Sequence, residues 1–302
     1  MLSLVLDLLS ARRWFDTGLP FQTSVHFTQG ACVWLLLSRD GAGDTYVKFS
    51  EHVSLHDEAA RYQAAGASYA TLVPAFVGYA SAGPIDVLVC RSVDFRSVDA
   101  SFLFGVKTGA APVADLLGYF KSMPLATPPA TLAGQAAVSN PALIATLDSY
   151  YAGHWLAPLA QRWLSSDSAH WLATLQPMAQ HGDFVLNNLG RTRSEQWVIF
   201  DWEDFGAVSL PGLDLFTFEL SLAGGAQSLL AKRALKAPAV QSFVALACAA
   251  MGLSVAQYVA LTPIYALVFR YLKRNYGPSV REQMDALIQQ IDQAGGSGCP
   301  AR

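Results

Sequence analysis

The sequence has little that would mark a disulfide-rich, zinc-binding or nucleic-acid-binding protein. Its four cysteines, Cys32, Cys90, Cys248 and Cys299, are scattered and include no C-x-x-C pair. We therefore expect neither a zinc ribbon nor a disulfide framework. We expect the protein to be located in a reducing compartment, the cytoplasm. Basic residues are not in excess, because 20 Lys and Arg stand against 23 Asp and Glu, a formal net charge of -3. A nucleic-acid partner would require a basic face, so none is expected.

Charged residues are also scarce, at 14% against 52% apolar residues, which excludes a disordered chain. The segment from Ala237 to Phe269 has no charged residue and is long enough to cross a bilayer. It nevertheless contains polar side chains and Pro263, and Gly252-Leu253-Ser254 is typical of one helix ending and another beginning. We therefore predict two buried core helices and no membrane span, with a membrane-associated or ligand-binding scaffold as the alternative.

The N-terminal residues 1–15 show the pattern of a short amphipathic helix. A secretory signal is not expected, because Asp7 interrupts the apolar stretch and the arginines follow it instead of preceding it.

The pattern of the chain changes near residue 91. Before it, strand-like runs occupy 24–49, 75–79 and 86–90, and residues 55–66 have helical spacing that Gly66 can close. After it, the pattern is mainly helical, with FVLNNLG and QWVIFDW predicted as two short strands. This order predicts an α+β fold with a small antiparallel-sheet lobe, 1–91, and a larger helical lobe, 92–302. Three tryptophans spaced by eight residues, Trp155, Trp163 and Trp171, are expected in the core of the second lobe.

The residues that can carry chemistry are Asp183, Asn188 and Asp201, which lie at the ends of short apolar runs. Transfer of a phosphoryl group from ATP needs oxygen ligands for Mg²⁺. It also needs a carboxylate beside the attacking hydroxyl, to orient it and accept its proton. The three side chains meet both requirements.

The segments HGDFVLNN and VIFDWE resemble the catalytic and metal-binding motifs of the aminoglycoside phosphotransferase/choline kinase family, H-G-D-x-x-x-x-N followed by D-x-E or D-W-E. The eighteen residues from Asp183 to Asp201 are a typical spacing for that family. The resemblance implies a protein-kinase-like fold of two lobes with a magnesium nucleotide, ATP or GTP, bound between them. It also implies that Asp183 is the catalytic base and that Asn188 and Asp201 are the Mg²⁺ ligands.

Upstream segments agree with this resemblance. Lys48, in the strand-like run Tyr46–Phe49, matches the family lysine that contacts the α- and β-phosphates. Glu58 on the following helix is its expected ion-pair partner, with Glu51 as a less favoured one.

The rest of the nucleotide site is less typical of the family. No G-x-G-x-x-G follows the first strand, and Gly30 alone punctuates it. The backbone from Val89 through Cys90 to Arg91 matches the hinge that meets adenine, and Asp214 matches the aspartate that supports the catalytic loop.

Four further features of the catalytic segment have simpler interpretations. We expect His181 to be structural and Asn187 to be a turn residue. Glu203 either assists the metal site or anchors its loop. The residues after Asp183, Phe-Val-Leu, predict an unusually apolar substrate side.

The acceptor is inferred from charge. Residues 205–302 carry five acidic and eight basic residues, and residues 100–180 carry three of each. A polycation would meet few carboxylates there, so a small-molecule hydroxyl compound that is neutral or anionic, such as a sugar or glycan-like alcohol, is favoured. An aminoglycoside kinase, a choline- or homoserine-type kinase and a non-catalytic pseudokinase are the alternatives. The sequence does not indicate an oligomeric state.

Overall fold

The computed structural model describes residues 1–27, 32–39, 44–91, 95–104, 113–123, 140–165, 171–172, 174–223 and 238–296. The chain forms two compact units. We call Met1–Arg96 with Gly190–Glu203 the sheet unit, and Ser97–Leu189 with Asp204–Arg302 the helical unit. The segment Gly190–Glu203 thus belongs with the N-terminal residues, and the boundary near residue 91 stays a prediction.

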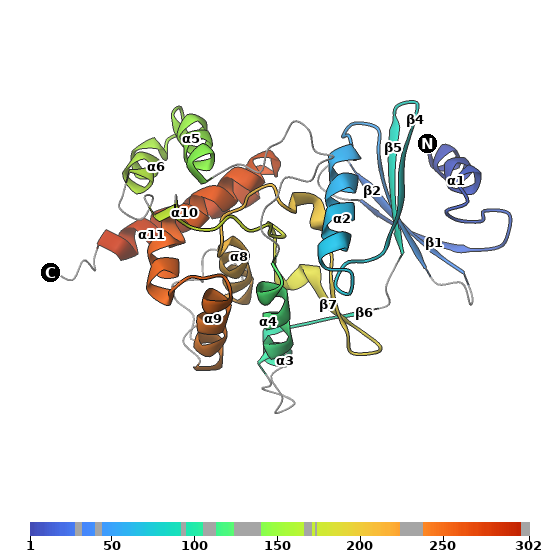
Figure 1. Ribbon diagram of the computed structural model, residues 1–302. Coiled ribbons are helices and arrows are strands. Elements are labelled where there is room, and N and C mark those ends of the chain that lie inside the picture. Colours follow the sequence, from blue (N-terminus) through green and yellow to red (C-terminus); the bar gives the residue numbers. More distant parts are fainter. Residues whose placement is uncertain are drawn as a thin grey trace. The chain divides into compact units, whose positions relative to one another are not determined.

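The sheet unit is built on a five-stranded antiparallel sheet in the order β1-β2-β3-β5-β4. Its strands are β1 (Gln22–Phe27), β2 (Val33–Ser38), β3 (Thr45–Ser50), β4 (Phe76–Ala82) and β5 (Ile85–Arg91). Helix α2 (His56–Ser68) follows β3 in the chain (Figure 1). The predicted antiparallel sheet with one inserted helix is confirmed. Helix α2 runs past Gly66, so the expectation that this glycine closes it was wrong; its Cβ position is open, and the helix continues to Ser68.

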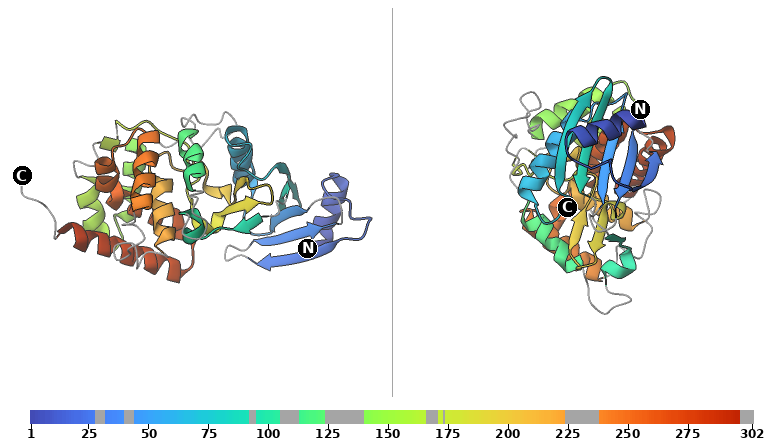
Figure 2. Two further views of the ribbon diagram at one scale, coloured as in Figure 1. Left: turned by 90° about the horizontal axis from the view of Figure 1, so that it is seen from below. Right: turned by 90° about the vertical axis from the view of Figure 1, so that its right-hand side faces the viewer.

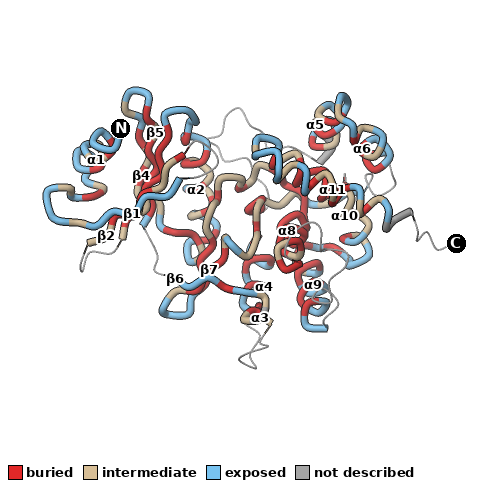
Figure 3. The backbone as a smooth tube through the Cα atoms, turned by 180° about the vertical axis from the view of Figure 1, so that it is seen from behind, coloured by how far each residue is buried: buried red, intermediate tan, exposed pale blue. Residues whose placement is uncertain are grey.

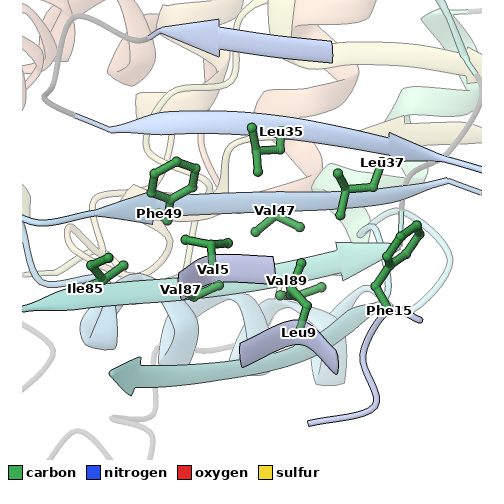
Figure 4. Close-up of a cluster of buried hydrophobic side chains, with 10 residues drawn as sticks. All are labelled: Val5, Leu9, Phe15, Leu35, Leu37, Val47, Phe49, Ile85, Val87 and Val89. Atoms are coloured by element: carbon green, nitrogen blue, oxygen red, sulfur yellow. The ribbon is translucent and has the colours of Figure 1, made fainter. Parts of the chain in front are cut away.

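The N-terminal helix α1 (Leu2–Ala11) covers one face of this sheet (Figure 2). Its Val5 and Leu9 are fully buried and belong to one apolar cluster with strand residues (Figure 4). The strand members alternate along β2, β3 and β5, because successive side chains in a strand point to opposite faces; they are Leu35, Leu37, Val47, Phe49, Ile85, Val87 and Val89. Residues between them in sequence, such as Lys48, therefore point to the face that α1 does not cover.

The central strands β3 and β5 are almost wholly buried, whereas every residue of the edge strand β1 is exposed (Figure 3). A second, three-stranded sheet contains β6 (Phe95–Ser97), β7 (Leu189–Thr192) and β8 (Trp197–Ile199). The prediction of a strand over FVLNNLG was wrong for most of its length. Residues Leu186–Asn188 form a 3-10 turn, η1, and the strand begins only at Leu189.

The described part of the helical unit contains eight α-helices. They are α3 (Ala100–Leu103), α4 (Val113–Lys121), α5 (Asn140–Tyr151), α6 (Ala157–Leu164), α8 (Leu213–Leu222), α9 (Pro238–Ala250), α10 (Val255–Leu272) and α11 (Pro278–Gly296). Helix α10 packs against α5, α6, α8, α9 and α11 and is the centre of this unit.

The uncharged segment forms two helices, as the sequence predicts. Helix α9 ends before Gly252, which has a left-handed φ of 72°. Ser254 then caps α10 by accepting a bond from the Gln257 backbone N–H, 3.1 Å, while Gln257 bonds back to the Ser254 N–H. Helix α10 with the turn that follows it, Val255–Asn275, is long and apolar enough to cross a membrane, but half of its most apolar window is buried in the unit. The absence of a membrane span stays a prediction.

The expected tryptophan core was wrong for two of its three members. Trp163 on α6 is 9% exposed, but Trp155 is 55% and Trp171 37% exposed. The regular spacing does not place the three tryptophans on one helix, because Trp155 lies in the turn between α5 and α6, and Trp171 lies beyond the end of α6.

Candidate active site

The sheet unit holds a buried lysine among carboxylates. Lys48 lies on β3, and its ammonium is 2.7 Å from Glu58 Oε2 on α2 and 3.0 Å from Glu203 Oε2. The lysine side chain is only 6% exposed and that of Glu58 9%. Burial lowers the pKa of Lys48, but the carboxylates of Glu58, Glu203 and Asp201 together raise it well above its ordinary value, so the lysine is charged. The ion pair predicted between Lys48 and Glu58 is present, and Glu51 is exposed on the surface.

The second half of this centre is the segment Asp201-Trp202-Glu203, which follows β8. Trp202 is completely buried, and its indole N–H donates to the Ile199 carbonyl at 2.7 Å. This anchor fixes the two acidic residues on either side of it. Asp201 adopts a left-handed φ of 62°, a strained conformation for a residue other than glycine, and such strain is concentrated at functional sites. Arg61 on α2 donates to the Glu203 carbonyl, so Glu203 both anchors its loop and contacts Lys48.

The donor set of this centre fits a magnesium ion. Carboxylate oxygens of Glu58, Asp201 and Glu203 all lie within 4.8 Å of one another. One oxygen of Glu58, Oε1, is buried without a hydrogen-bond partner among the described residues. Hard cations such as Mg²⁺ take oxygen ligands of this kind. Glu58 and Glu203 both contact the Lys48 ammonium, and the sequence motif marks Asp201, so Asp201 is the expected metal ligand among the three.

The predicted hinge lies at the end of β5. Val89 and Cys90 are buried in this strand, which is paired with β3 on one side and β4 on the other. The Arg91 N–H donates to the Ala75 carbonyl at 2.8 Å. Burial raises the pKa of the Cys90 thiol to about 12, so the thiol is uncharged and inert. An adenine contact at Val89–Arg91 stays a prediction, and the predicted role of Gly30 falls outside the described residues.

The helical unit holds the predicted catalytic loop. Asp183 and Asn188 are both partly buried, and the Asn188 amide nitrogen donates to the Asp183 carbonyl at 2.9 Å. That bond leaves the amide oxygen of Asn188 as the atom able to ligate a cation. Asn188 is the last residue of the short turn η1, and Asn187 within that turn is exposed, as expected for a turn residue.

Asp214 supports the loop from inside the unit. It is completely buried on α8 and accepts bonds from the backbone N–H groups of His181 and Gly182, both at 2.8 Å, and from the Tyr119 hydroxyl. Burial raises the pKa of Asp214, while the neighbouring His181 and these donors oppose the rise. His181 is also buried, and its Nδ1 accepts the Asp183 N–H at 3.2 Å. The predicted support by Asp214 and the structural role of His181 are both present.

Gly182 allows the catalytic segment to approach Asp204, which follows Asp201-Trp202-Glu203 in the chain. Its φ is +88°, and a Cβ built there would lie 2.7 Å from Asp204 Cβ. Phe184, by contrast, turns into the core, where it is fully buried and stacks on Tyr119 with ring centroids 4.6 Å apart. The prediction of an apolar substrate side was therefore wrong for Phe184, because its ring supplies core packing.

Lys273 contacts the predicted base Asp183, a contact that the sequence did not reveal. It lies at the start of the turn η5 (Lys273–Asn275), directly after α10, and its ammonium is 2.9 Å from Asp183 Oδ2 and 3.7 Å from Asp204 Oδ2. A signal for it does exist, since it lies near the end of a long apolar segment and a lysine buried there needs a carboxylate partner. The sequence does not say which carboxylate that is.

The comparisons place the chain among phosphotransferases. The model of the phosphotransferase enzyme family, APH, matches residues 33–218, more than half of the 302 residues. A search of curated proteins finds no match.

Solved structures of similar fold include several small-molecule kinases. The choline kinase LicA from Streptococcus pneumoniae superposes with a TM-score of 0.62 at 12% identity, covering 96% of this chain and 98% of that chain. A mutant of the aminoglycoside phosphotransferase APH(4)-Ia, in a ternary complex with ADP and hygromycin B, gives 0.61 at 13% identity and covers 97% and 100%. A putative fructosamine-3-kinase from Haemophilus somnus gives 0.57 at 12% identity and covers 95% and 96%.

The fold is thus that of the protein-kinase-like small-molecule kinases, with an N-terminal antiparallel sheet and helix and a largely helical C-terminal part. The chain belongs to the phosphotransferase enzyme family. It is a kinase of that family.

Proposed function

We propose that this kinase transfers the γ-phosphoryl group of ATP to a hydroxyl of a neutral or anionic polyhydroxy compound, such as a sugar or glycan-like alcohol. Asp183 is the base in this proposal. Its side chain is only 15% exposed, its backbone is held by His181 and Asn188, and its position follows the family motif. A carboxylate so placed orients the attacking hydroxyl and accepts its proton as the new oxygen–phosphorus bond forms and the bond from the γ-phosphorus to the departing ADP breaks.

On the donor side, Lys48 would hold the α- and β-phosphates, and Glu58 keeps its ammonium in place. Asp201 and the amide oxygen of Asn188 would hold Mg²⁺. When bound, the ion neutralises charge on the phosphates of the nucleotide. Support for a nucleotide donor comes from the solved relatives, of which one contains ADP and another AMP.

The choice of acceptor rests on one observation, the Lys273 ammonium 2.9 Å from the Asp183 carboxylate. An acceptor whose hydroxyl meets Asp183 brings its neighbouring groups close to that ammonium. Two like unit charges about 4 Å apart repel by roughly 4 kcal/mol at an effective dielectric constant of 20. Asp183 and Asp204 carry the opposite charge and offset part of this repulsion, so the expected preference against cationic acceptors applies to a positive group that lies directly against the ammonium.

The overall positive charge of residues 205–302 is weaker support. Four of its eight bases fall outside the described residues; they are Lys232, Arg233, Lys236 and Arg302. Of the others, Arg270 is paired with Asp285 at 2.5 Å and Lys273 with Asp183. The proposal therefore depends on the local charge at Asp183.

A panel of acceptors matched in size and differing in charge tests this function. Glucose, N-acetylglucosamine, glucuronate and glucosamine share one ring, and choline, homoserine and kanamycin extend the panel to other kinase substrates. We expect kcat/KM for glucosamine, at a pH where its amine is charged, to be at least tenfold below that of its N-acetylated form, consistent with a penalty above about 1.4 kcal/mol. Preferential turnover of kanamycin or choline over every saccharide would contradict the proposal.

A further inference from the structure

A buried cation, Lys273, connects the catalytic loop to a segment of the helical unit that lies ninety residues further along the chain. Lys273 is 4% exposed, and three oxygens surround its ammonium: Asp183 Oδ2 at 2.9 Å, Tyr276 Oη at 3.3 Å and Asp204 Oδ2 at 3.7 Å. The ammonium also lies 4.6 Å from the centre of the Tyr276 ring, within range of a cation–π interaction. The side chain is therefore held in one position from several directions.

This ammonium is charged although it is buried. Burial lowers the pKa of Lys273, but the carboxylates of Asp183 and Asp204 raise it above its ordinary value. A buried ammonium is tolerated only when such partners are present. Lys273 thus supplies a fixed positive charge at the carboxylate that the proposed function makes the base.

The geometry of Asp183 leaves one oxygen for chemistry. Its Oδ2 accepts from Lys273, while its backbone N–H and carbonyl bond to His181 and Asn188. A carboxylate held by its backbone alone can rotate about its side-chain bonds. The contact with Lys273 removes that freedom and makes Oδ1 the oxygen that can receive the acceptor proton.

We propose that Lys273 is a positioning residue for phosphoryl transfer, which acts by orienting the Asp183 carboxylate. This inference rests on the proposed role of Asp183 as the base. The same ammonium also contacts Asp204, which directly follows Glu203 in the chain. Lys273 therefore fixes the position of Asp183 relative to Asp204.

The test compares Lys273→Met, Lys273→Arg and the double variant Asp183→Asn/Lys273→Met with Asp183→Asn and the wild type. Arg274→Met is the matched control, because Arg274 is the adjacent cation and is exposed. Its guanidinium donates a hydrogen bond to the Tyr271 carbonyl and lies over the Tyr271 ring. Turnover is measured with whichever acceptor the wild type uses, or with water in slow ATP hydrolysis if no acceptor is found. In this way the inference is tested even if the proposed acceptor class is wrong.

We expect Lys273→Met to lower kcat by about 10- to 100-fold with little change in nucleotide affinity, since misplacing a catalytic group by about 1 Å can cost a factor of this size. Lys273→Arg, which keeps the charge, should recover part of the loss. Because Lys273 acts through Asp183, the double variant should be no slower than Asp183→Asn alone.

Three results would overturn the inference. One is wild-type kcat in Lys273→Met. Another is a double variant whose losses multiply, which would mean that Lys273 acts independently of Asp183. The third is unfolding of both Lys273→Met and Lys273→Arg in thermal melts, which would mean that the lysine serves the fold alone.

Discussion

The ammonium of Lys273 lies 2.9 Å from the carboxylate of Asp183, although ninety residues separate the two in the chain. A second lysine, Lys48, is held in the same manner in the sheet unit, 2.7 Å from Glu58 and 3.0 Å from Glu203. Each unit therefore contains a buried lysine that is held by two carboxylates. Each cluster includes residues that the family motifs mark, Asp183 in one and Lys48 with Glu203 in the other, and the two clusters lead to the following predictions.

Asp201→Ala should abolish stabilisation of the protein by magnesium nucleotide, because the variant loses a metal ligand. A ligand at about 100 times its dissociation constant stabilises the folded state by roughly 2.7 kcal/mol, which a thermal melt resolves. Glu195→Gln is the control, since Glu195 is an exposed carboxylate on the same hairpin, where it pairs with Arg96 at 2.6 Å and with Arg191 at 3.5 Å. An Asp201→Ala variant that still shows the full Mg-dependent shift would exclude Asp201 as a ligand.

Asp183→Asn should separate nucleotide binding from chemistry. The amide keeps the shape of the side chain but cannot accept the proton, so turnover should fall by roughly 10²- to 10⁴-fold. The melting shift with magnesium nucleotide should stay close to that of the wild type. A variant with normal turnover would remove Asp183 from the role of base.

Lys48→Met should weaken both nucleotide binding and the fold. The substitution leaves the Glu58 carboxylate buried without its cation, and breaking a buried ion pair from one side costs about 3–5 kcal/mol. Urea unfolding measures this loss. In the double variant Lys48→Met/Glu58→Gln the stranded charge is removed, so stability should partly return while nucleotide binding does not. Equal instability of the single and double variants would show that the charge is not the cause.

Gly182→Ala should impair both stability and turnover. A methyl group there meets Asp204 Cβ at 2.7 Å, and the φ of +88° is itself strained for alanine, at a cost of about 1–3 kcal/mol. Gly83→Ala separates the two effects, because Gly83 has a φ of +59° but open space around its Cβ position. We expect the Gly83 variant to lose only the conformational part and to keep its activity. Equal losses in the two variants would mean that the contact with Asp204 is unimportant.

The local parts of this structure follow from the sequence. Lys48 lies on the face of β3 that α1 does not cover, because it alternates along the strand with the apolar residues Val47 and Phe49. The break between α9 and α10 follows from Gly252 and Ser254 in the same way. At these positions the residues adjacent in the sequence determine the local structure.

Other parts depend on contacts between distant segments, and there the sequence was insufficient. Lys273 could be counted as a charge but not assigned to Asp183, since no spacing rule joins the end of α10 to the catalytic loop. Phe184 was expected at the substrate side, yet the stacking partner that draws it into the core is Tyr119. The regular spacing of Trp155, Trp163 and Trp171 had no structural meaning, because no single helix contains them.

The residues that hold the catalytic loop in place are buried, and this affects where the sequences of such kinases can diverge. Asp214, Tyr119 and His181 are all inside the helical unit and bond mainly to one another and to backbone. Substitutions on the exposed surface can therefore accumulate without disturbing the support of Asp183. A chain built in this way can vary widely on its surface while the buried support of the loop at Asp183 is kept.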